Sequence, residues 1–292
     1  MNNIDMAALL LTAGIGRKKV HKILSHYGEK ELTINDLKEI IHSNFFKITL
    51  SQLHHFYEKS KRIIDWAEKA HIDVVDFQHP RYPLSLRGIE DPPLLLFIKG
   101  EYGFIRKEEN CVGVIGTREP TDYGKEIAKM VGGYLAKKNV GVVSGLALGC
   151  DTGAHLGCLK NKGRTAAVLA HGLDMIYPKE NRNLAEEIIA SGGCLISEYF
   201  PFEKPKNYSF IERDRIQSGL SKGIIVIETE ETGGTMHTVN FARKQKKKIG
   251  CMKYPKTFNK YSTLKGNQII LNMNAVPIKN YRDIDDFIKA SN

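Results

Sequence analysis

Short apolar runs alternate with amphipathic segments from about residue 110 to residue 252. The runs are apolar throughout, as in parallel strands covered on both faces, and the segments between them carry apolar residues at helical spacing. The runs occupy residues 111–116, 140–145, 165–170, 194–199, 223–229 and 248–252. This alternation predicts a doubly wound α/β fold with an extended Rossmann-like, mostly parallel sheet. Ligands of such folds bind beyond the carboxyl ends of the strands.

Residues 1–71 follow a different pattern, which predicts a small all-α domain in front of an α/β domain at 72–292. Two apolar-periodic segments flank the Gly-Ile-Gly sequence at 14–16, as in a helix-hairpin-helix or SAM-like unit, although a plain turn between two helices has the same pattern. Four prolines between residues 77 and 100 predict an extended connector without a helix, ended by a strand at "LLLFIKG".

The cellular compartment is also constrained by the sequence. No apolar run approaches the roughly 18 residues that a membrane-spanning helix needs, and no basic segment precedes the first apolar stretch. We therefore expect a cytoplasmic protein without a membrane partner. The five cysteines are odd in number and lack C-x-x-C spacing, which argues against a disulfide framework and against a zinc ribbon.

Positive charge is concentrated towards the C-terminal end. The formal net charge is +10, and the segment from Thr232 to Arg282 holds eleven lysines and arginines but no aspartate or glutamate. The run "RKQKKK" at 243–248 is also typical of an exposed last helical turn, where cations favour the macrodipole. The length of the acid-free segment favours a polyanionic partner, and nucleic acid in particular.

Two of the predicted strands are followed by loops suited to anions. After the first strand, Gly116 permits a tight turn, Thr117 offers a hydroxyl and a backbone amide, and Arg118 offers a guanidinium fork. This loop lacks the G-x-G-x-x-G pattern, so no nicotinamide cofactor is predicted. After the fifth strand, Gly234 and Thr235 place further amides at the start of a basic helix.

The stretch "VSGLALGCDTGAHLGC" at 143–158 follows the second strand. Ser144 and Gly145 end that strand, and Asp151 has the position of a helix N-cap. We expect the free amides of this glycine-rich turn to bind an anion. His155 is expected one turn into the helix, either at the floor of the pocket or packed beneath it.

The segment after the fourth strand combines an aromatic residue with arginines. Ser209 and Glu212 have the spacing of a capping box, which predicts that a helix starts at Phe210. Phe210 and Arg213 then share one face, while Arg215 points elsewhere. Such a pair can stack on a base and contact a phosphate, although a core phenylalanine beside solvated arginines has the same pattern.

These loops do not favour catalysis or metal binding. Cys150, His155 and Cys158 surround one helix start, with no second cluster to complete four ligands, so no metal site is predicted. Cys150 and His155 lack the placement of a nucleophile and its base, and no glycine loop carries a Walker lysine. The sequence predicts a site that holds an anion, and a protein that is not an enzyme.

Several linked motifs resemble the DprA (Smf) family of DNA-processing proteins. The family's order and spacing are found in "GTREPTDYG", "VVSGLALGCDTGAH", "GLDMIYPKENRNLAEEI", "SEYFPFEKPKNYSFIERDRIQSGLS" and "ETGGTMHTVNFA". The resemblance covers about residues 72–280. It implies an extended Rossmann fold that binds single-stranded DNA without evident catalysis or a cofactor, forms a homodimer, and loads a RecA-type recombinase during natural transformation.

The resemblance also implies the residues of a single-stranded DNA site. They are Gly116, Thr117, Arg118, Ser144, Gly145, Lys206, Phe210, Arg213, Gly234 and Thr235. The chain departs from the family pattern at Asp214, because the usual sequence is Arg-Asn-Arg, and an acid here lies where a phosphate should pass or neutralises an arginine. It also departs at Met236 and His237, where Leu-Ile is usual.

Two other functions remain open from the residues alone. The "TGGT" sequence at 232–235 is similar to part of the Pro-Gly-Gly-x-Gly-Thr loop of LOG-type nucleotide phosphoribohydrolases, which implies a nucleotide-processing enzyme. The proline is absent, however, and no glutamate follows Thr235 within the helix. A sensor of a signalling nucleotide is the third candidate.

Overall fold

The structure is a computed structural model that describes residues 9, 15–21, 33, 36, 49–106, 111–258 and 260–289. Its strands are β1 (Asp73–Asp76), β2 (Leu95–Gly100), β3 (Cys111–Ile115), β4 (Gly141–Ser144), β5 (Thr165–Leu169), β6 (Cys194–Ser197), β7 (Gly223–Val226), β8 (Lys248–Met252) and β9 (Val276–Ile278). Within the described residues they form one sheet in the order β1-β2-β6-β5-β4-β3-β7-β8-β9.

The sheet is mostly parallel, as predicted. All neighbouring pairs from β6 to β9 along the sheet are parallel, whereas β1 and β2 are antiparallel to each other and β2 is antiparallel to β6. The six predicted strands and the strand at "LLLFIKG" are confirmed as β3 to β8 and β2. The sequence did not reveal β1 and β9, which have only four and three residues.

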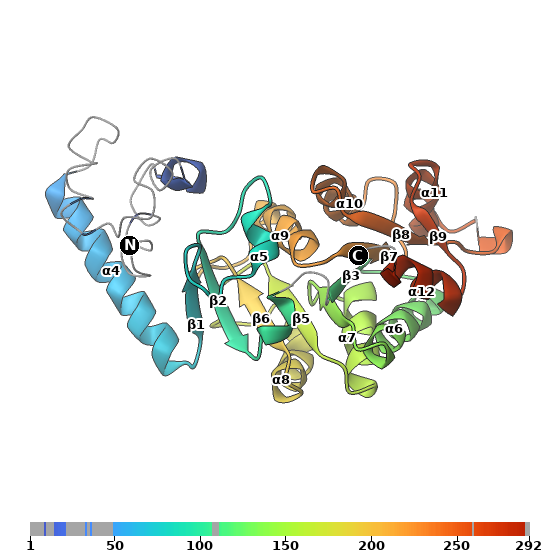
Figure 1. The fold of residues 1–292 in the computed structure, drawn as a ribbon, viewed down its shortest axis with the longest axis horizontal. Coiled ribbons are helices and arrows are strands. Elements are labelled where there is room, and N and C mark those ends of the chain that lie inside the picture. The colour runs from blue at the N-terminus through green and yellow to red at the C-terminus, as the bar shows by residue number, and fades with distance from the viewer. Residues whose placement is uncertain are drawn as a thin grey trace.

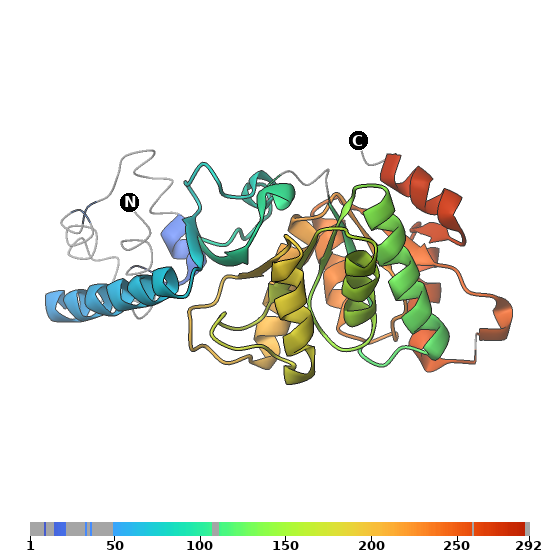
Figure 2. The same ribbon diagram turned by 90° about the horizontal axis from the view of Figure 1, so that it is seen from below.

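Helices cover both faces of the sheet. They are α4 (Leu50–Lys69), α5 (Leu84–Arg87), α6 (Asp122–Lys137), α7 (Cys150–Lys160), α8 (Arg182–Ala190), α9 (Asn207–Gly219), α10 (Thr235–Lys244), α11 (Lys265–Asn272) and α12 (Tyr281–Lys289). Figure 1 shows α9, α10 and α11 above the sheet and α6, α7 and α8 below it. The turned view shows α6, α7 and α8 side by side on their face (Figure 2). This is the doubly wound arrangement that the sequence predicts.

The proline-rich connector contains a helix, contrary to the prediction. The single turn α5 begins directly after Pro83, whose ring fixes φ at a helical value and whose missing N–H needs no partner at a helix start. Its Leu86 is fully buried with Ile216 of α9 in one apolar cluster. The prolines therefore limit the length of the helix without preventing it.

Strand residues alternate between the two faces of the sheet. Val112 and Val114 of β3 pack against α6 and α7, whereas Ile115 packs in the cluster that contains Val239 of α10. This alternation follows from the period of two in a strand, and because both faces of β3 are covered, its residues are apolar on both faces.

The N-terminal residues that the structure describes pack against one end of the sheet. Leu9, Ile15 and Val20 are buried in the same cluster as Ile63 of α4 and Phe97 of β2. Of the predicted hairpin turn at 14–16, the structure describes Ile15 and Gly16, which are followed by a helical segment at 17–21. Gly14 and most of the sequence around the turn lie outside the described residues. A domain boundary after residue 71 remains a prediction.

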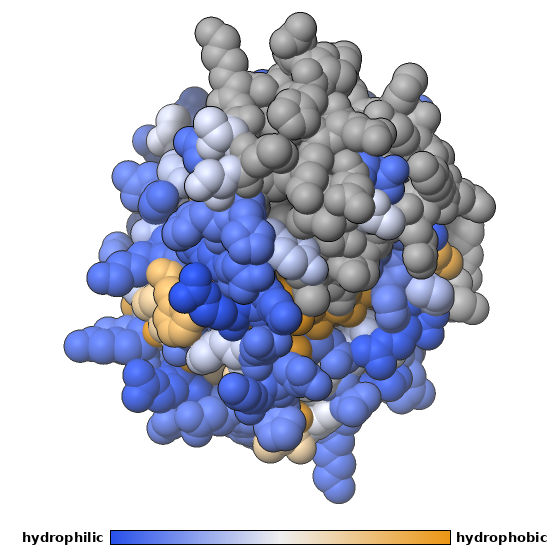
Figure 3. All heavy atoms as spheres, turned by 90° about the vertical axis from the view of Figure 1, so that its left-hand side faces the viewer, coloured by the Kyte–Doolittle hydropathy of each residue, from blue (hydrophilic) through white to orange (hydrophobic). Residues whose placement is uncertain are grey.

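The face at the left of Figure 1 is largely hydrophilic where the structure describes it, and its hydrophobic atoms show only in small patches (Figure 3). None of the described helices has the length and apolar composition to cross a membrane.

Candidate functional site

The sheet has a topological switch point between β3 and β7. β3 pairs with β4 on one side and with β7 on the other, and α6 and α10, which follow β3 and β7, lie on opposite faces (Figure 1). Ligands of open α/β sheets bind at such a point. A cavity of about 700 Å³ lies there, bordered by the loops after β3 and β7 and by the starts of α9 and α10.

Most of the predicted site residues meet at this cavity. Those that line it are Gly116, Thr117, Arg118, Phe210, Arg213, Gly234 and Thr235. Ser144, Gly145 and Lys206 are not part of the lining. The buried Ser144 hydroxyl donates to the Val114 carbonyl at 2.7 Å. Lys206 is exposed at the start of α9, with its ammonium 5.5 Å from the Tyr208 ring centroid.

Two aromatic rings and one guanidinium form a wall of the cavity. The guanidinium carbon of Arg118 lies 5.0 Å from the ring centroid of Phe210, within the range of a cation–π contact. The Tyr177 ring centroid lies 6.0 Å from that of Phe210. Arg118 is exposed and forms no ion pair with any carboxylate in the described part of the chain. The wall thus offers flat apolar surface beside an uncompensated positive charge.

Helix α9 begins earlier than predicted. Its first residue is Asn207, its N-cap is Lys206, and no side chain caps it. The predicted capping box is wrong, because Ser209 lies inside the first turn and is buried, whereas an N-cap serine must precede the helix. The predicted shared face is confirmed, since Phe210 and Arg213 both line the cavity.

Arg213 is buried and held by three partners. Its Nη1 donates to the carbonyls of Gly145 at 2.8 Å and Val168 at 2.7 Å, and its Nε donates to Asp214 at 3.1 Å. Gly145 is required here because a Cβ would overlap the guanidinium. Burial raises the pKa of Asp214 to about 6, although Arg213 opposes this rise.

Asp151 supplies the anion that the turn after β4 was expected to bind. The prediction that Asp151 is the N-cap is wrong, because Gly149 has that position and Asp151 lies inside α7. Its carboxylate accepts hydrogen bonds from the amides of Gly145 at 3.0 Å and Ala147 at 3.3 Å. The prediction that these amides are free for a ligand is therefore wrong.

His155 is packed beneath the turn and is absent from the cavity lining. Its Nδ1 is 2.7 Å from the Thr165 hydroxyl, and burial lowers its pKa to about 3. Cys150 and Cys158 are likewise buried, and burial raises the pKa of the Cys158 thiol to about 12. Among the described residues, no group of three or more His, Cys, Asp and Glu side chains is placed to hold a metal ion.

The loop after β3 is tied to the loop after β7. The Thr117 amide, predicted to face a ligand, donates instead to the Glu228 carbonyl at 2.7 Å. A Cβ at Gly116 would lie 2.5 Å from Sγ of Cys150, so only glycine fits there. The Glu228 carboxylate accepts from the amide of Thr121 at 2.8 Å and from its hydroxyl at 2.6 Å. These bonds fix the position of Arg118.

Some lining residues were not predicted from the sequence. Tyr177 comes from the connection between β5 and α8, and Ser262 and Thr263 come from the connection after β8. Glu230 precedes α10, and His237 lies in its first turn. Tyr177 lies in a motif that carried the family resemblance, but nothing in the local pattern indicates that this tyrosine reaches Phe210.

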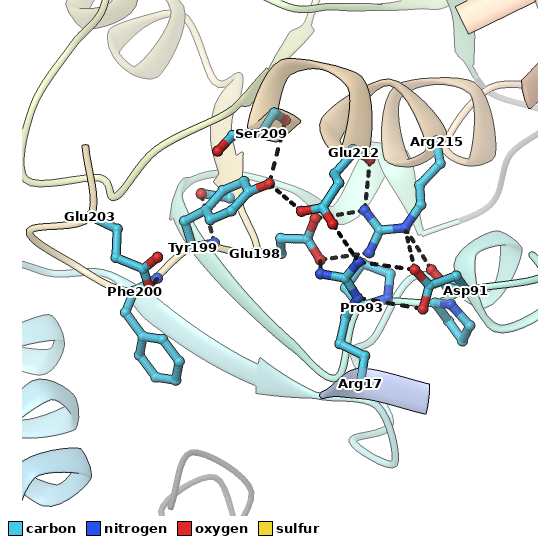
Figure 4. Close-up of polar contacts among 12 residues, drawn as sticks. Arg17, Asp91, Pro93, Glu198, Tyr199, Phe200, Glu203, Ser209, Glu212 and Arg215 are labelled. Atoms are coloured by element: carbon cyan, nitrogen blue, oxygen red, sulfur yellow. Dashed lines mark hydrogen bonds and ion pairs between the residues drawn. The ribbon is translucent and has the colours of Figure 1, made fainter. Parts of the chain in front are cut away.

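A buried ion cluster supports α9 on the side away from its start (Figure 4). Arg215 binds both oxygens of Glu198 at 2.6 Å, and its Nε donates to the Asp91 carbonyl at 2.7 Å. Arg17 joins Asp91 at 3.0 Å, Glu198 at 3.2 Å and Glu212 at 3.2 Å. Arg215 thus points away from the cavity, as predicted, and the cluster connects the N-terminal region to α9.

Comparisons with known proteins agree with this geometry. A family model described as DNA recombination-mediator protein A matches residues 73–289. The chain is 37% identical over 199 residues to DNA processing protein DprA of Bacillus subtilis, covering 68% of this chain and 66% of that protein. It is 32% identical over 250 residues to DprA of Streptococcus pneumoniae, covering 81% and 82%. The match to Protein Smf of Synechocystis, at 41% identity over 165 residues, covers 56% of this chain and 41% of that protein.

Solved structures are also similar. The X-ray structure of DNA processing protein A from Streptococcus pneumoniae has a TM-score of 0.79 at 28% identity and covers 97% of both chains. A structure of DNA processing protein A from Helicobacter pylori, which gives insight into the single-stranded DNA binding mode of that protein, has a TM-score of 0.65 at 28% identity. It covers 76% of this chain and 96% of that one.

Proposed function

Because the chain belongs to the DNA recombination-mediator protein A family, we propose that it binds single-stranded DNA in the cavity between β3 and β7 and does not act as an enzyme on it. The single-stranded DNA binding of the Helicobacter pylori relative supports this ligand. A non-catalytic role is supported by the placement of Cys150 and His155, the nucleophile and base considered from the sequence. Both side chains are buried and neither lines the cavity.

The contact of Arg118 with Phe210 is the observation that carries the proposal. Phe210 and Tyr177 offer ring faces on which bases stack irrespective of their sequence. Arg118 lies beside these rings with no carboxylate partner among the described residues, so it can bind the phosphate of a stacked nucleotide. An aromatic ring and a free guanidinium at one edge match the alternation of bases and phosphates in a single strand.

The remaining site residues support the strand in different ways. Gly234 and Thr235 begin α10, whose N-terminal amides attract a further phosphate. Gly116 and Thr117 hold the loop that carries Arg118. Ser144 and Gly145 act from behind the lining, by joining β4 to β3 and by holding Arg213. Lys206 serves as an outer phosphate contact.

The wider role follows from the family. We propose that the chain protects single-stranded DNA and loads a RecA-type recombinase on it during DNA uptake, a role that the family's description as a recombination mediator supports. We also propose that it acts as a cytoplasmic homodimer. Sedimentation of the purified chain tests the dimer. Recombinase assembly on a strand coated with single-strand-binding protein, measured with and without this chain, tests the loading step.

Binding of single strands is tested by fluorescence anisotropy with single-stranded DNA, duplex DNA and RNA of equal length, each titrated at several salt concentrations. We expect tighter binding of the single strand than of the duplex, with an affinity that falls steeply as salt rises. Equal affinity for duplex and single strand, or no binding, contradicts the proposal.

A second candidate function rests on Asp214. A carboxyl group whose pKa is raised to about 6 inside a cavity is typical of an acid or base in catalysis, which favours a nucleotide-processing enzyme. The ion pair with Arg213 gives Asp214 a structural role instead. Release of free base from nucleoside monophosphates, followed by chromatography, distinguishes the two.

A further inference from the structure

A second group of aromatic rings lies beside the main cavity. The ring centroid of Tyr123 on α6 is 5.0 Å from that of Phe258, which in turn is 5.7 Å from that of Tyr261. Tyr254 packs against both Tyr123 and Phe258 at 5.8 Å. Tyr123 is 48% exposed and Tyr261 is 39% exposed. These four residues, here called the aromatic surface, thus present rings to solvent at both ends.

Positive charge surrounds the aromatic surface. Lys253 and Lys279 line a cavity of about 330 Å³ together with Tyr123 and Tyr254. The Lys260 ammonium lies 5.3 Å from the Tyr261 ring centroid. These three lysines are exposed, and none forms an ion pair with a carboxylate within the described ranges.

The nearest acids of α6 do not cancel this charge. Asp122 pairs with Lys125 at 2.8 Å, and Glu126 pairs with Lys129 at 2.7 Å. The lysines belong to the acid-free segment from Thr232 to Arg282. The positive charge of this surface therefore complements the negative charge of a polyanion.

The aromatic surface is connected to the main cavity through the chain, because Tyr261 directly precedes two residues that line the cavity. It lies mostly on the connection after β8, which projects at the right-hand end of the molecule in Figures 1 and 2. The 3-10 turn η6 (Ser262–Leu264) follows Tyr261 directly, and its Ser262 and Thr263 line the main cavity. A DNA strand that leaves the main cavity past Ser262 and Thr263 reaches Tyr261 next.

We propose that the aromatic surface is a second base-stacking site for the same single strand, where Tyr261, Phe258 and Tyr123 hold bases and the adjoining lysines hold phosphates. This inference rests on the proposed function, because the strand must first occupy the main cavity. Rings with an exposed face bind every type of base, and the lysines follow the backbone. The strand that occupies both sites is longer than the one that fills the main cavity alone.

The test compares oligo-dT of about six nucleotides with oligo-dT of about 20 nucleotides by anisotropy, since single-strand sites span about 4–16 nucleotides. The double variant Tyr123→Ala, Tyr261→Ala should lower affinity for the long strand by about 5-fold or more and leave affinity for the short strand unchanged. Tyr261→Phe should keep the wild-type affinity. Tyr281→Ala is the matched control, because Tyr281 is an exposed tyrosine of the same acid-free segment that stacks on Tyr134.

Other outcomes identify which idea fails. If Phe210→Ala lowers affinity for both strands but the double variant changes neither, the main site stands and the inference is wrong. If wild-type protein binds neither strand, the proposed function fails first. If the double variant has the wild-type melting temperature and the wild-type affinity for both strands, but its mass in sedimentation differs from that of wild type, the surface is a contact between copies and the inference is wrong. Crosslinking of a 5-iododeoxyuridine strand to Tyr261 gives an independent positive result.

Discussion

The guanidinium of Arg118 lies over the ring of Phe210, with 5.0 Å between its carbon and the ring centroid. The two residues come from different elements, since Arg118 follows β3 and Phe210 belongs to α9. The contact restricts a long side chain that otherwise has many rotamers, so less entropy is lost when it binds a phosphate. Charge and ring face are therefore presented together.

Replacing Phe210 by alanine should weaken single-stranded DNA binding about 5- to 150-fold, the range for loss of one base stack. Phe210→Tyr should retain affinity, because the ring face remains. Phe202→Ala is a matched control, since Phe202 is 62% exposed and packs against Trp66 on another part of the molecule. Equal affinity of Phe210→Ala and wild type in anisotropy titrations contradicts the stacking role.

Replacing Arg118 by alanine should change the salt dependence of binding. Loss of one phosphate contact should reduce the slope of log affinity against log salt by about one. Arg118→Lys should keep this slope but lose affinity, because an ammonium lacks the planar fork. Arg182→Ala, an exposed arginine on α8, serves as the control and should keep both values. An unchanged slope for Arg118→Ala places the phosphate elsewhere.

Asp214 should make DNA binding depend on pH. Its pKa is raised to about 6 by burial, so it is neutral below this pH and offsets Arg213 above it. We expect affinity to fall as pH rises through about 6, by at most about tenfold if DNA shifts this pKa by one unit. Asp214→Asn should bind more tightly than wild type at pH above 7 in anisotropy titrations.

Stability gives a second readout. Because the folded-state pKa lies above the unfolded value of about 3.9, the native state binds more protons between about pH 4 and 6. The free energy of unfolding should therefore fall as pH rises across this window, and the fall should be smaller in Asp214→Asn, where only other carboxyl groups with raised pKa values, such as those of Asp151 and Glu203, contribute to it. Identical pH profiles of the two proteins argue against the raised pKa.

Asp151 should matter for stability more than for ligand contact. Asp151→Ala leaves the amides of Gly145 and Ala147 without their acceptor, which should cost about 1–3 kcal/mol. Urea unfolding measures the loss. Asp122→Ala is the control, because its carboxylate is 99% exposed, and it should change stability by less than about 0.5 kcal/mol. A loss for Asp151→Ala no larger than that of the control means that the two amides find other partners.

The alternation of apolar runs was sufficient to predict the central strands β3 to β8 and the helices α6 to α10, but it did not predict α11 and α12. Such runs report burial on both faces directly, as β3 and β7 do. The short strands β1 and β9 were not predicted, because three or four residues are too few to show the alternation of apolar and polar residues that is typical of a strand. The helix α5 was not predicted because the prolines around it indicated an extended chain. Tertiary packing of its buried Leu86 stabilises this helix.

Within the site, sequence reasoning located the loops but not the partners of their polar groups. It assigned Asp151 as a cap and Thr117 as an amide donor to a ligand, whereas both bond to the protein itself. Residues that reach the cavity from distant connections, such as Tyr177 and Ser262, were not found. Long-range hydrogen bonds and loop crossings depend on tertiary packing, which no local pattern encodes.

Breaking the buried ion cluster should destabilise the protein strongly and in a graded way. Arg215→Ala leaves Glu198 buried without its bidentate partner, which should cost about 3–5 kcal/mol in urea unfolding. Arg17→Ala should cost less, because the Arg17 side chain is 24% exposed and Glu198 keeps Arg215. Removing Arg215 and Glu198 together should cost less than the sum of the two single changes, since neither partner is left unpaired. Additive losses would mean that the two residues act independently of each other.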